Sequence, residues 1–160
     1  YVIRHAWAGQ SGDPGFPDDT LRPLTDEGRK RFRRVVAKLA KRKMAPARIA
    51  SSPLVRCRQT AELLVEGLDV APSLTVLNAL EPGARFEDVL PWLQHQTDVE
   101  QLALVGHAPD VGLLVGSMIG GADAMIDIAK GAIACVEFGD RLAASCGALR
   151  WLVTAKMLGE

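Results

Sequence analysis

Two arginines and two histidines stand where short apolar runs of the sequence end. Arg4 and His5 follow the opening run, and His107 follows the run Leu102–Gly106. Arg56 comes shortly after a third run, near the start of an expected helix. Because open α/β sheets bind ligands at the carboxyl ends of their parallel strands, these side chains are expected to converge on one crevice. The combination predicts a site that handles a phosphoryl group.

Phosphoryl transfer explains why these residue types matter. The transferred group spreads negative charge over its oxygens, and the planar fork of an arginine can bind two of them while staying charged. A neutral imidazole can attack phosphorus and form a phosphohistidine that water later cleaves. We expect His5 to be this nucleophile, with its pKa lowered by repulsion from the arginines and the second histidine. His107 would stabilise charge, and Arg4 and Arg56 would bind the phosphate.

The elements that position these residues can be read from turn signals and apolar spacing. Residues 9–19 are rich in Gly, Pro and Asp, which predicts a long loop that flanks or covers the site. Thr25 is expected to cap a helix whose apolar stripe runs to residue 40. Residues 48–52 predict a second strand, and Pro53 is expected to be the first residue of the next helix.

The rest of the chain continues the alternation of strands and helices. In order, the sequence predicts an extended segment at 74–77, a helix over 86–93, a buried strand at Leu102–Gly106, a helix at Asp110–Ile119, and strands at 132–138 and 148–154. This alternation predicts a three-layer α/β/α architecture with a mostly parallel central sheet flanked by helices. A length of 160 residues suits one domain over residues 1–160.

Bulk composition narrows the function classes. The formal net charge is zero, so no global field favours nucleic acid or a membrane surface as a partner. Residues 29–43 are strongly basic, which we interpret as a solvated helix face, with docking of an acidic protein as the alternative. Three cysteines make no even disulfide framework and no metal-ligand spacing, so a reducing cytoplasm is expected. No signal peptide is recognised, and a few residues are expected to precede Tyr1.

The motifs around these residues resemble the histidine phosphatase superfamily, also called phosphoglycerate mutase-like. The resemblance rests on Arg4-His5-Ala6, on the stretch from Ser51 to Ala61 that contains Arg56, on Leu24-Thr25-Asp26-Glu27-Gly28, and on Val105-Gly106-His107. The short length and Gly106-His107-Ala108-Pro109 are most similar to SixA-type phosphohistidine phosphatases. The resemblance implies that His5 is phosphorylated, that Arg4, Arg56 and His107 complete a phosphate-binding pocket, and that no metal or cofactor is needed.

The general acid is the weakest part of the pattern. One branch of the superfamily places an aspartate directly after the second histidine, where this chain has Ala108. Glu81 is the candidate general acid in its place, and Asp18 and Asp19 are weaker candidates. Because the phosphorus–nitrogen bond of a phosphoramidate is already labile, a missing acid favours a phosphohistidine substrate. The expected partner is therefore a protein that carries phosphohistidine.

Two other functions remain open from the sequence. The same scaffold could serve as a phosphomonoesterase acting on a small phosphorylated metabolite, or as a non-catalytic phosphate-binding adaptor. A cysteine-dependent mechanism is set aside, although Cys135 and Arg141 have the spacing of that class. Glu137 and Asp140 would repel an anion there, and no helix pattern follows Arg141 to lower the thiol pKa.

Overall fold

The sheet of the protein, seen in a computed structural model that describes residues 1–12, 14–121 and 124–160, has six strands in the order β3-β2-β4-β1-β5-β6. The strands are β1 Val2–Arg4, β2 Arg48–Ser51, β3 Ser73–Val76, β4 Leu102–Gly106, β5 Ile133–Phe138 and β6 Gly147–Val153. Strands β3, β2, β4 and β1 are parallel, while β5 pairs antiparallel with both β1 and β6. The sheet is therefore mostly parallel, as the sequence predicts.

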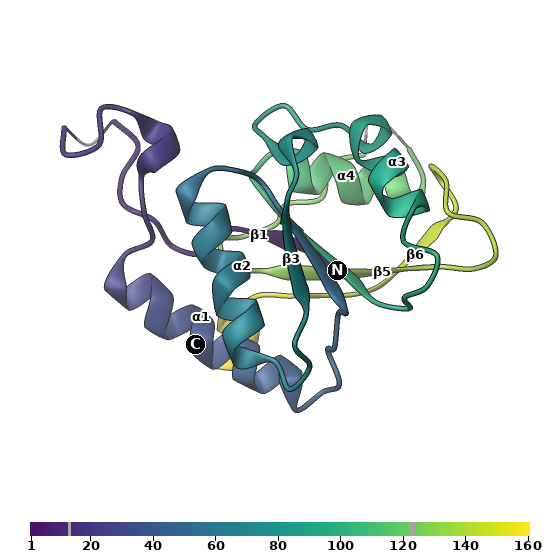
Figure 1. Ribbon diagram of the computed structural model, residues 1–160, viewed down its shortest axis with the longest axis horizontal. Helices are drawn as coiled ribbons and strands as arrows, with labels where there is room; N and C mark the ends of the chain where they lie inside the picture. Colours follow the sequence, from purple (N-terminus) through teal and green to yellow (C-terminus); the bar gives the residue numbers. More distant parts are fainter. Residues whose placement is uncertain (13, 122–123) are drawn as a thin grey trace.

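Helices cover both faces of this sheet, which gives the expected three layers (Figure 1). The α-helices of the described residues are α1 Asp26–Ala40, α2 Val55–Gly67, α3 Phe86–Gln94 and α4 Asp110–Ile119. Side chains alternate along each strand, so Ile3 packs with α1 and α2 on one face while Val2 packs with α3 and α4 on the other. Strands covered on both faces need apolar residues at successive positions, which explains the apolar runs.

Local signals set most element boundaries. The Thr25 hydroxyl accepts a hydrogen bond from the Gly28 amide at 3.0 Å and caps α1, as predicted. The prediction that Pro53 is the first helical residue is wrong. Helix α2 begins at Val55, because Leu54 still has extended backbone angles (φ −63°, ψ 136°). Arg56 nevertheless lies in the first turn of α2, as predicted.

The loop over residues 9–19 leaves β1 and projects from the body of the molecule (Figure 1). Asp13 of this loop lies outside the described residues. The loop ends in a short 3₁₀ helix, Asp19–Leu21, which the sequence analysis did not predict. Two further 3₁₀ helices occupy Asn78–Leu80 and Lys156–Leu158.

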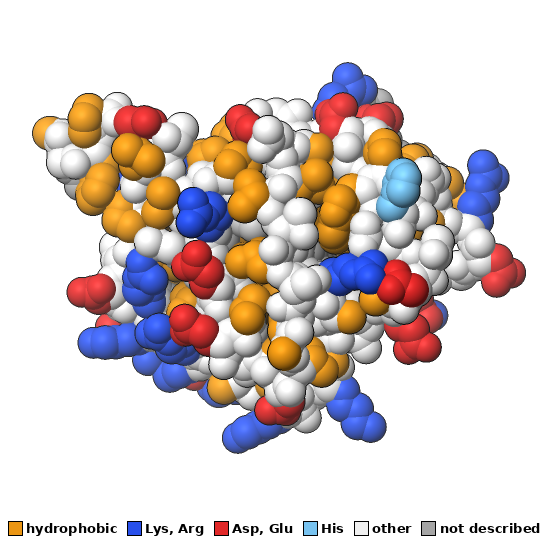
Figure 2. All heavy atoms as spheres, in the orientation of Figure 1, with side chains coloured by type: hydrophobic (Ala, Val, Ile, Leu, Met, Phe, Trp, Pro, Cys, Tyr) orange, Lys and Arg blue, Asp and Glu red, His pale blue; other side chains and the backbone are white. Residues whose placement is uncertain are grey.

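The basic residues of α1 lie mostly on the surface, interspersed with acidic side chains (Figure 2). Arg33 pairs with Glu66 at 3.3 Å, and Arg34 lies 3.8 Å from Glu27. Such pairs reduce the positive field of the helix, in agreement with a solvated face. No helix in the described part of the chain is long and apolar enough to cross a membrane.

Candidate active site

Three neighbouring strands end in register at one edge of the sheet. Arg4 of β1 lies beside Gly106 of β4, and Ser51 of β2 lies beside Val105 of β4. The pairing continues past the strand ends, because the His5 amide donates to the Gly106 carbonyl at 3.0 Å. His5 and His107 therefore follow adjacent strand ends, and their ring centroids are 5.5 Å apart. This is the convergence that the sequence predicts.

His5 is buried, and one of its ring nitrogens is already engaged. Nδ1 lies 2.7 Å from the carbonyl oxygen of Ala6. A carbonyl can only accept a hydrogen bond, so Nδ1 carries the proton of the neutral ring and Nε2 keeps a free lone pair. Burial lowers the pKa of His5 to about 3, and repulsion from Arg56, His107 and Arg4 acts in the same direction. The ring is therefore neutral at physiological pH, a state that suits a nucleophile.

His107 is held from the side of β2 and α2. Its Nε2 lies 2.8 Å from the hydroxyl of Ser52 and 3.4 Å from the sulfur of Cys57. The pKa of His107 is lowered to about 4, mainly by burial and in smaller part by the charge of Arg56. A neutral imidazole fixed in this way can form a hydrogen bond to a phosphoryl oxygen.

Arg4 and Arg56 are anchored alike and share an unmet hydrogen-bonding need. In Arg4, Nη1 donates to the carbonyl of Ile128 at 3.0 Å, and in Arg56, Nη1 donates to the carbonyl of Asp19 at 2.8 Å. The Nε atoms of both are buried without a hydrogen-bond partner among the described residues. Buried polar groups normally have partners. Because an anion would provide them, and because Arg56 lies at the start of α2, this geometry fits a phosphate-sized anion.

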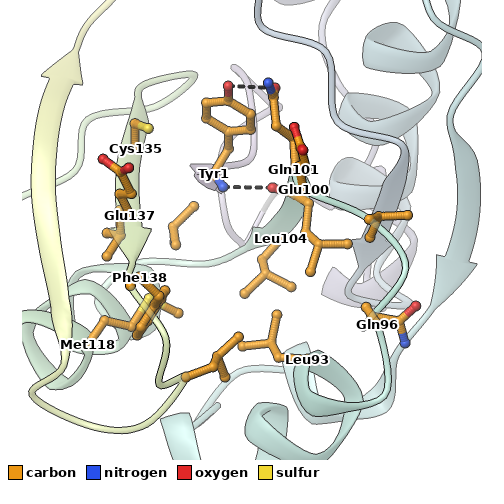
Figure 3. A pocket seen from close by; sticks show the side chains of 16 residues that line it. Tyr1, Leu93, Gln96, Glu100, Gln101, Leu104, Met118, Cys135, Glu137 and Phe138 are labelled. Carbon is orange, nitrogen blue, oxygen red and sulfur yellow. Dashed lines mark hydrogen bonds between the residues drawn. The ribbon is translucent and has the colours of Figure 1, made fainter.

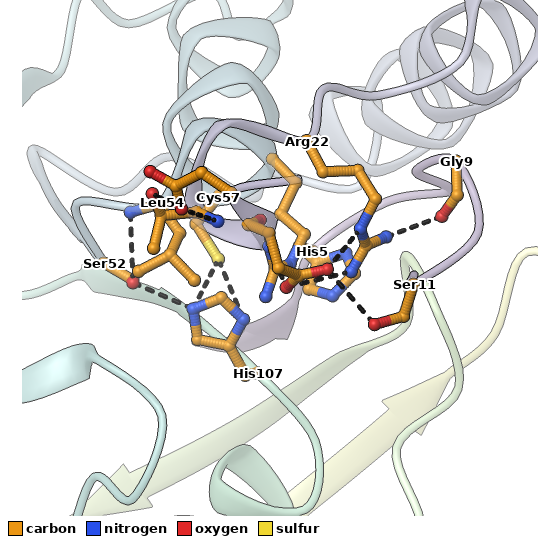
Figure 4. A network of polar contacts seen from close by, with 12 residues as sticks. His5, Gly9, Ser11, Arg22, Ser52, Leu54, Cys57 and His107 are labelled. Atoms are coloured by element: carbon orange, nitrogen blue, oxygen red, sulfur yellow. Dashed lines mark hydrogen bonds and ion pairs between the residues drawn. The ribbon is translucent and has the colours of Figure 1, made fainter. Parts of the chain in front are cut away.

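Arg22 is a site residue that the sequence analysis missed. It is 7% exposed, and its guanidinium donates to Asp19 through Nε at 2.8 Å and to the carbonyl of Gly9 through Nη1 at 2.6 Å. Figure 4 shows the Arg22 side chain directed toward the region of His5. A single arginine between a loop and a proline carries no periodic signal. Its burial depends on tertiary contacts that a sequence pattern does not reveal.

The acid candidates lie outside the histidine pair. Glu81 is exposed at the end of the Asn78–Leu80 3₁₀ helix, and within residues 1–12, 14–121 and 124–160 its carboxylate makes no hydrogen bond or ion pair. Asp18 accepts hydrogen bonds from the amide and hydroxyl of Thr20, and Asp19 contacts Arg22 and Arg56. These contacts lower the pKa of both aspartates, whereas a general acid needs a raised pKa.

The cysteines lie in environments unlike that of a nucleophilic thiol. Cys57 is buried, and burial raises the pKa of its thiol to about 12, so the thiol stays protonated. Cys135 is a residue of β5, and burial raises the pKa of its thiol as well. A groove of about 630 Å³ beside Cys135 is lined by Tyr1, Leu93 and Phe138, with no histidine or arginine among its lining residues (Figure 3). This groove is therefore separate from the histidine pair.

No group of three His, Cys, Asp or Glu side chains in the described ranges is arranged to hold a metal ion. The residues that do converge are two neutral imidazoles and three arginines. Such a set can bind a phosphoryl group, accept it on a nitrogen, and neutralise the charge that develops during transfer. The arrangement matches the requirements of phosphoryl transfer through a histidine.

The model of the histidine phosphatase superfamily (branch 1) matches residues 1–81, and the chain belongs to this superfamily. Among its relatives, the phosphohistidine phosphatase SixA of Escherichia coli (strain K12) is 30% identical over 123 residues. That match covers 76% of this chain and 74% of SixA.

Solved structures agree with this assignment. The protein histidine phosphatase SixA complexed with tungstate has a TM-score of 0.85 to this chain at 28% identity, covering 98% of this chain and 97% of SixA. The α-ribazole phosphatase of Shigella flexneri has the same fold, with a TM-score of 0.74 at 16% identity, covering 96% of this chain and 95% of the phosphatase. The protein is thus a SixA-like member of the superfamily with phosphatase chemistry.

Proposed function

We propose that this protein removes the phosphoryl group from phosphohistidine on a partner protein, through a covalent intermediate on His5. The observation that carries the proposal is the state of His5: a buried neutral ring whose Nδ1 is bonded to Ala6 and whose Nε2 has no hydrogen-bond partner among the described residues. The Nε atoms of Arg4 and Arg56, which also lack a partner in the described part of the chain, support a phosphoryl group as the ligand.

In the first step, the lone pair of His5 Nε2 forms a bond to phosphorus while the phosphorus–nitrogen bond of the substrate breaks. The departing imidazole keeps the electron pair of that bond and takes a proton from solvent. In the second step, water attacks phosphorus, the bond to Nε2 breaks, and inorganic phosphate leaves. Arg4, Arg56 and His107 neutralise the oxygens during both transfers.

Two considerations favour a phosphoramidate over an alkyl phosphate as the substrate. An alkyl phosphate needs a proton donor for its leaving oxygen, and Glu81, the acid candidate, is exposed without any contact to the histidine pair among the described residues. A phosphohistidine needs less help because its bond is labile. Similarity to the phosphohistidine phosphatase SixA points the same way. The similarity to the α-ribazole phosphatase, at 16% identity, shows only that the two proteins share a fold.

The experiment that tests the intermediate is a rapid quench without acid, using a labelled phosphoryl donor and mass analysis of the intact protein. We expect one phosphoryl group on His5 in the wild type and none in His5→Ala. The matched control is His95→Ala, because His95 is exposed at the end of α3, away from the strand ends. Wild-type protein that binds phosphate but never carries a phosphoryl group would favour the adaptor function instead.

A further inference from the structure

Asp19 joins two arginines of the site. Its Oδ1 accepts from Arg22 Nε at 2.8 Å, and its Oδ2 lies 3.4 Å from Arg22 Nη2 and 3.2 Å from Arg56 Nη1. The backbone carbonyl of Asp19 also accepts from Arg56 Nη1, at 2.8 Å. One residue thus contacts two guanidinium groups from different elements, the segment before α1 and the first turn of α2. Figure 4 shows one of these two arginines, Arg22, on the side of the site where His5 lies.

The negative charge of Asp19 offsets the repulsion between the positive charges of Arg22 and Arg56. The side chains of Arg22 and Arg56 are only 9% and 6% exposed, whereas that of Asp19 is 44% exposed. Two cations held close together with little water between them repel, and solvent screens this repulsion poorly. The same balance is visible in the pKa of Arg56, which the charge of Asp19 raises and that of Arg22 lowers. A carboxylate that touches both guanidiniums offsets their repulsion.

Asp19 contacts Arg56 at one nitrogen of the guanidinium. All of its contacts with Arg56 involve Nη1, and the buried Nε has no partner among the described residues. Asp19 is in turn fixed from the loop, because the hydroxyl of Ser11 donates to its Oδ1 at 3.2 Å. The Arg56 guanidinium is therefore held through Nη1, and its buried Nε has a hydrogen-bonding capacity that no described residue uses.

We propose that Asp19 is a positioning residue that orients Arg22 and Arg56 for the phosphoryl group, with Arg22 as a further phosphate-binding residue. This inference rests on the proposed function. The opposite role for Asp19 is competition, in which its carboxylate occupies the arginines and hinders binding of the ligand. The two roles predict changes of opposite sign when the charge of Asp19 is removed.

Binding of orthovanadate by titration calorimetry separates these roles, because this ion imitates the trigonal transition state of phosphoryl transfer. We expect Asp19→Asn to weaken vanadate binding about tenfold, since residues of one network show coupling of this size. In an Arg22→Ala background, the same change is expected to cost about threefold or less. There the repulsion is gone, and the Asp19 carbonyl still holds Arg56.

Asp18→Asn is the matched control. It removes the same charge from the neighbouring residue, whose carboxylate contacts only Thr20 in the described structure, and we expect vanadate affinity to change by less than about twofold. Tighter vanadate binding by Asp19→Asn would overturn the positioning role in favour of competition. Equal losses with and without Arg22, or an equal loss in Asp18→Asn, would overturn it as well. If Asp19→Asn does not fold, Asp19→Ala, which also removes the charge, provides the same comparison.

The outcome is distinguishable from failure of the proposed function. Vanadate binding needs the arginines but no turnover, so the coupling between Asp19 and Arg22 can be present in a protein that never forms a phosphohistidine. That result would remove the catalytic mechanism and keep the role of Asp19. Wild-type protein without affinity for vanadate would overturn both.

Discussion

Nδ1 of His5 lies 2.7 Å from the carbonyl oxygen of Ala6, the residue that follows it in the chain. This short local contact fixes both the tautomer and the orientation of the ring, because the acceptor belongs to the backbone beside it. The hydrogen bond would by itself raise the pKa of His5, yet burial outweighs it and the ring stays neutral. The backbone at the end of β1 therefore determines which ring nitrogen of His5 keeps its lone pair.

We predict that the phosphoryl group of the intermediate is attached to Nε2 of His5. Attachment at Nδ1 would require the loss of the Ala6 hydrogen bond and a rotation of a buried ring. The isomer can be assigned by ³¹P and ¹⁵N NMR of protein with labelled histidine, phosphorylated and kept at alkaline pH. A phosphoryl group on Nδ1 would show that the ring turns during the reaction.

We predict that the protein loses stability as the pH falls from about 6.5 toward about 4, the interval in which an unfolded histidine binds a proton. The folded pKa values of His5 and His107 are about 3 and about 4, so only the unfolded chain takes up protons in this interval. Each histidine can then lower the free energy of unfolding by up to about 1.4 kcal/mol per pH unit.

Urea denaturation at a series of pH values measures this slope. His107→Gln is expected to make this slope shallower, because it removes one of the two histidines with a lowered pKa. The depressed pKa of Asp19 adds a loss of the same sign, but only below the usual pH range of a carboxyl group. A slope in the wild type that is equal to that of His107→Gln would contradict the expected titration.

We predict that Arg56→Ala reduces turnover by about 100-fold or more. The variant loses a guanidinium group that would bind the phosphoryl oxygens on which negative charge develops during transfer. Arg58→Ala is the control in the same turn of α2, because Arg58 is exposed and should retain nearly full activity. Steady-state rates with a phosphoramidate substrate measure both. Comparable losses in the two variants would indicate a general effect of charge on α2.

The sequence predicted the strand ends well because their signals are local. A strand buried on both faces must be apolar, and the polar residues that follow it stand out, as His5 and His107 do. The start of α2 was misplaced by two residues because Pro53 is compatible with a first helical turn. What decides the boundary is the extended backbone at Leu54, next to Ser52, whose hydroxyl contacts both the Leu54 amide and His107.

Residues that act through tertiary contacts could not be found in this way. Arg22 carries no periodic signal, and the role of Asp19 depends on the meeting of a loop with α2. For the low pKa of His5, the sequence analysis named charge repulsion alone as the cause. In the structure, burial is the larger cause and repulsion adds to it, because the depth of a side chain depends on packing.

We predict that Cys135→Ser leaves turnover unchanged within about twofold, as expected of a residue away from the reaction. Cys135 lines the groove of about 630 Å³, and none of the site arginines is among the residues that line this groove (Figure 3). Burial raises the pKa of the Cys135 thiol, which keeps it protonated. Activity of the wild type and Cys135→Ser with the same substrate decides the point. A variant that folds but is inactive would favour the cysteine-dependent mechanism.

The effect of Glu81→Gln depends on the leaving group of the substrate. With a phosphoramidate, we expect turnover within about twofold of the wild type, because the labile phosphorus–nitrogen bond needs no strong acid. If alkyl phosphates are turned over and Glu81 protonates their leaving oxygen, that activity should fall at least about 100-fold in the variant. The ratio of the two activities, measured in the same preparations of both proteins, therefore reports on the acid directly. A large loss with alkyl phosphates alone would favour the phosphomonoesterase function, whereas an equal loss with both substrates would show that Glu81 supports the site itself.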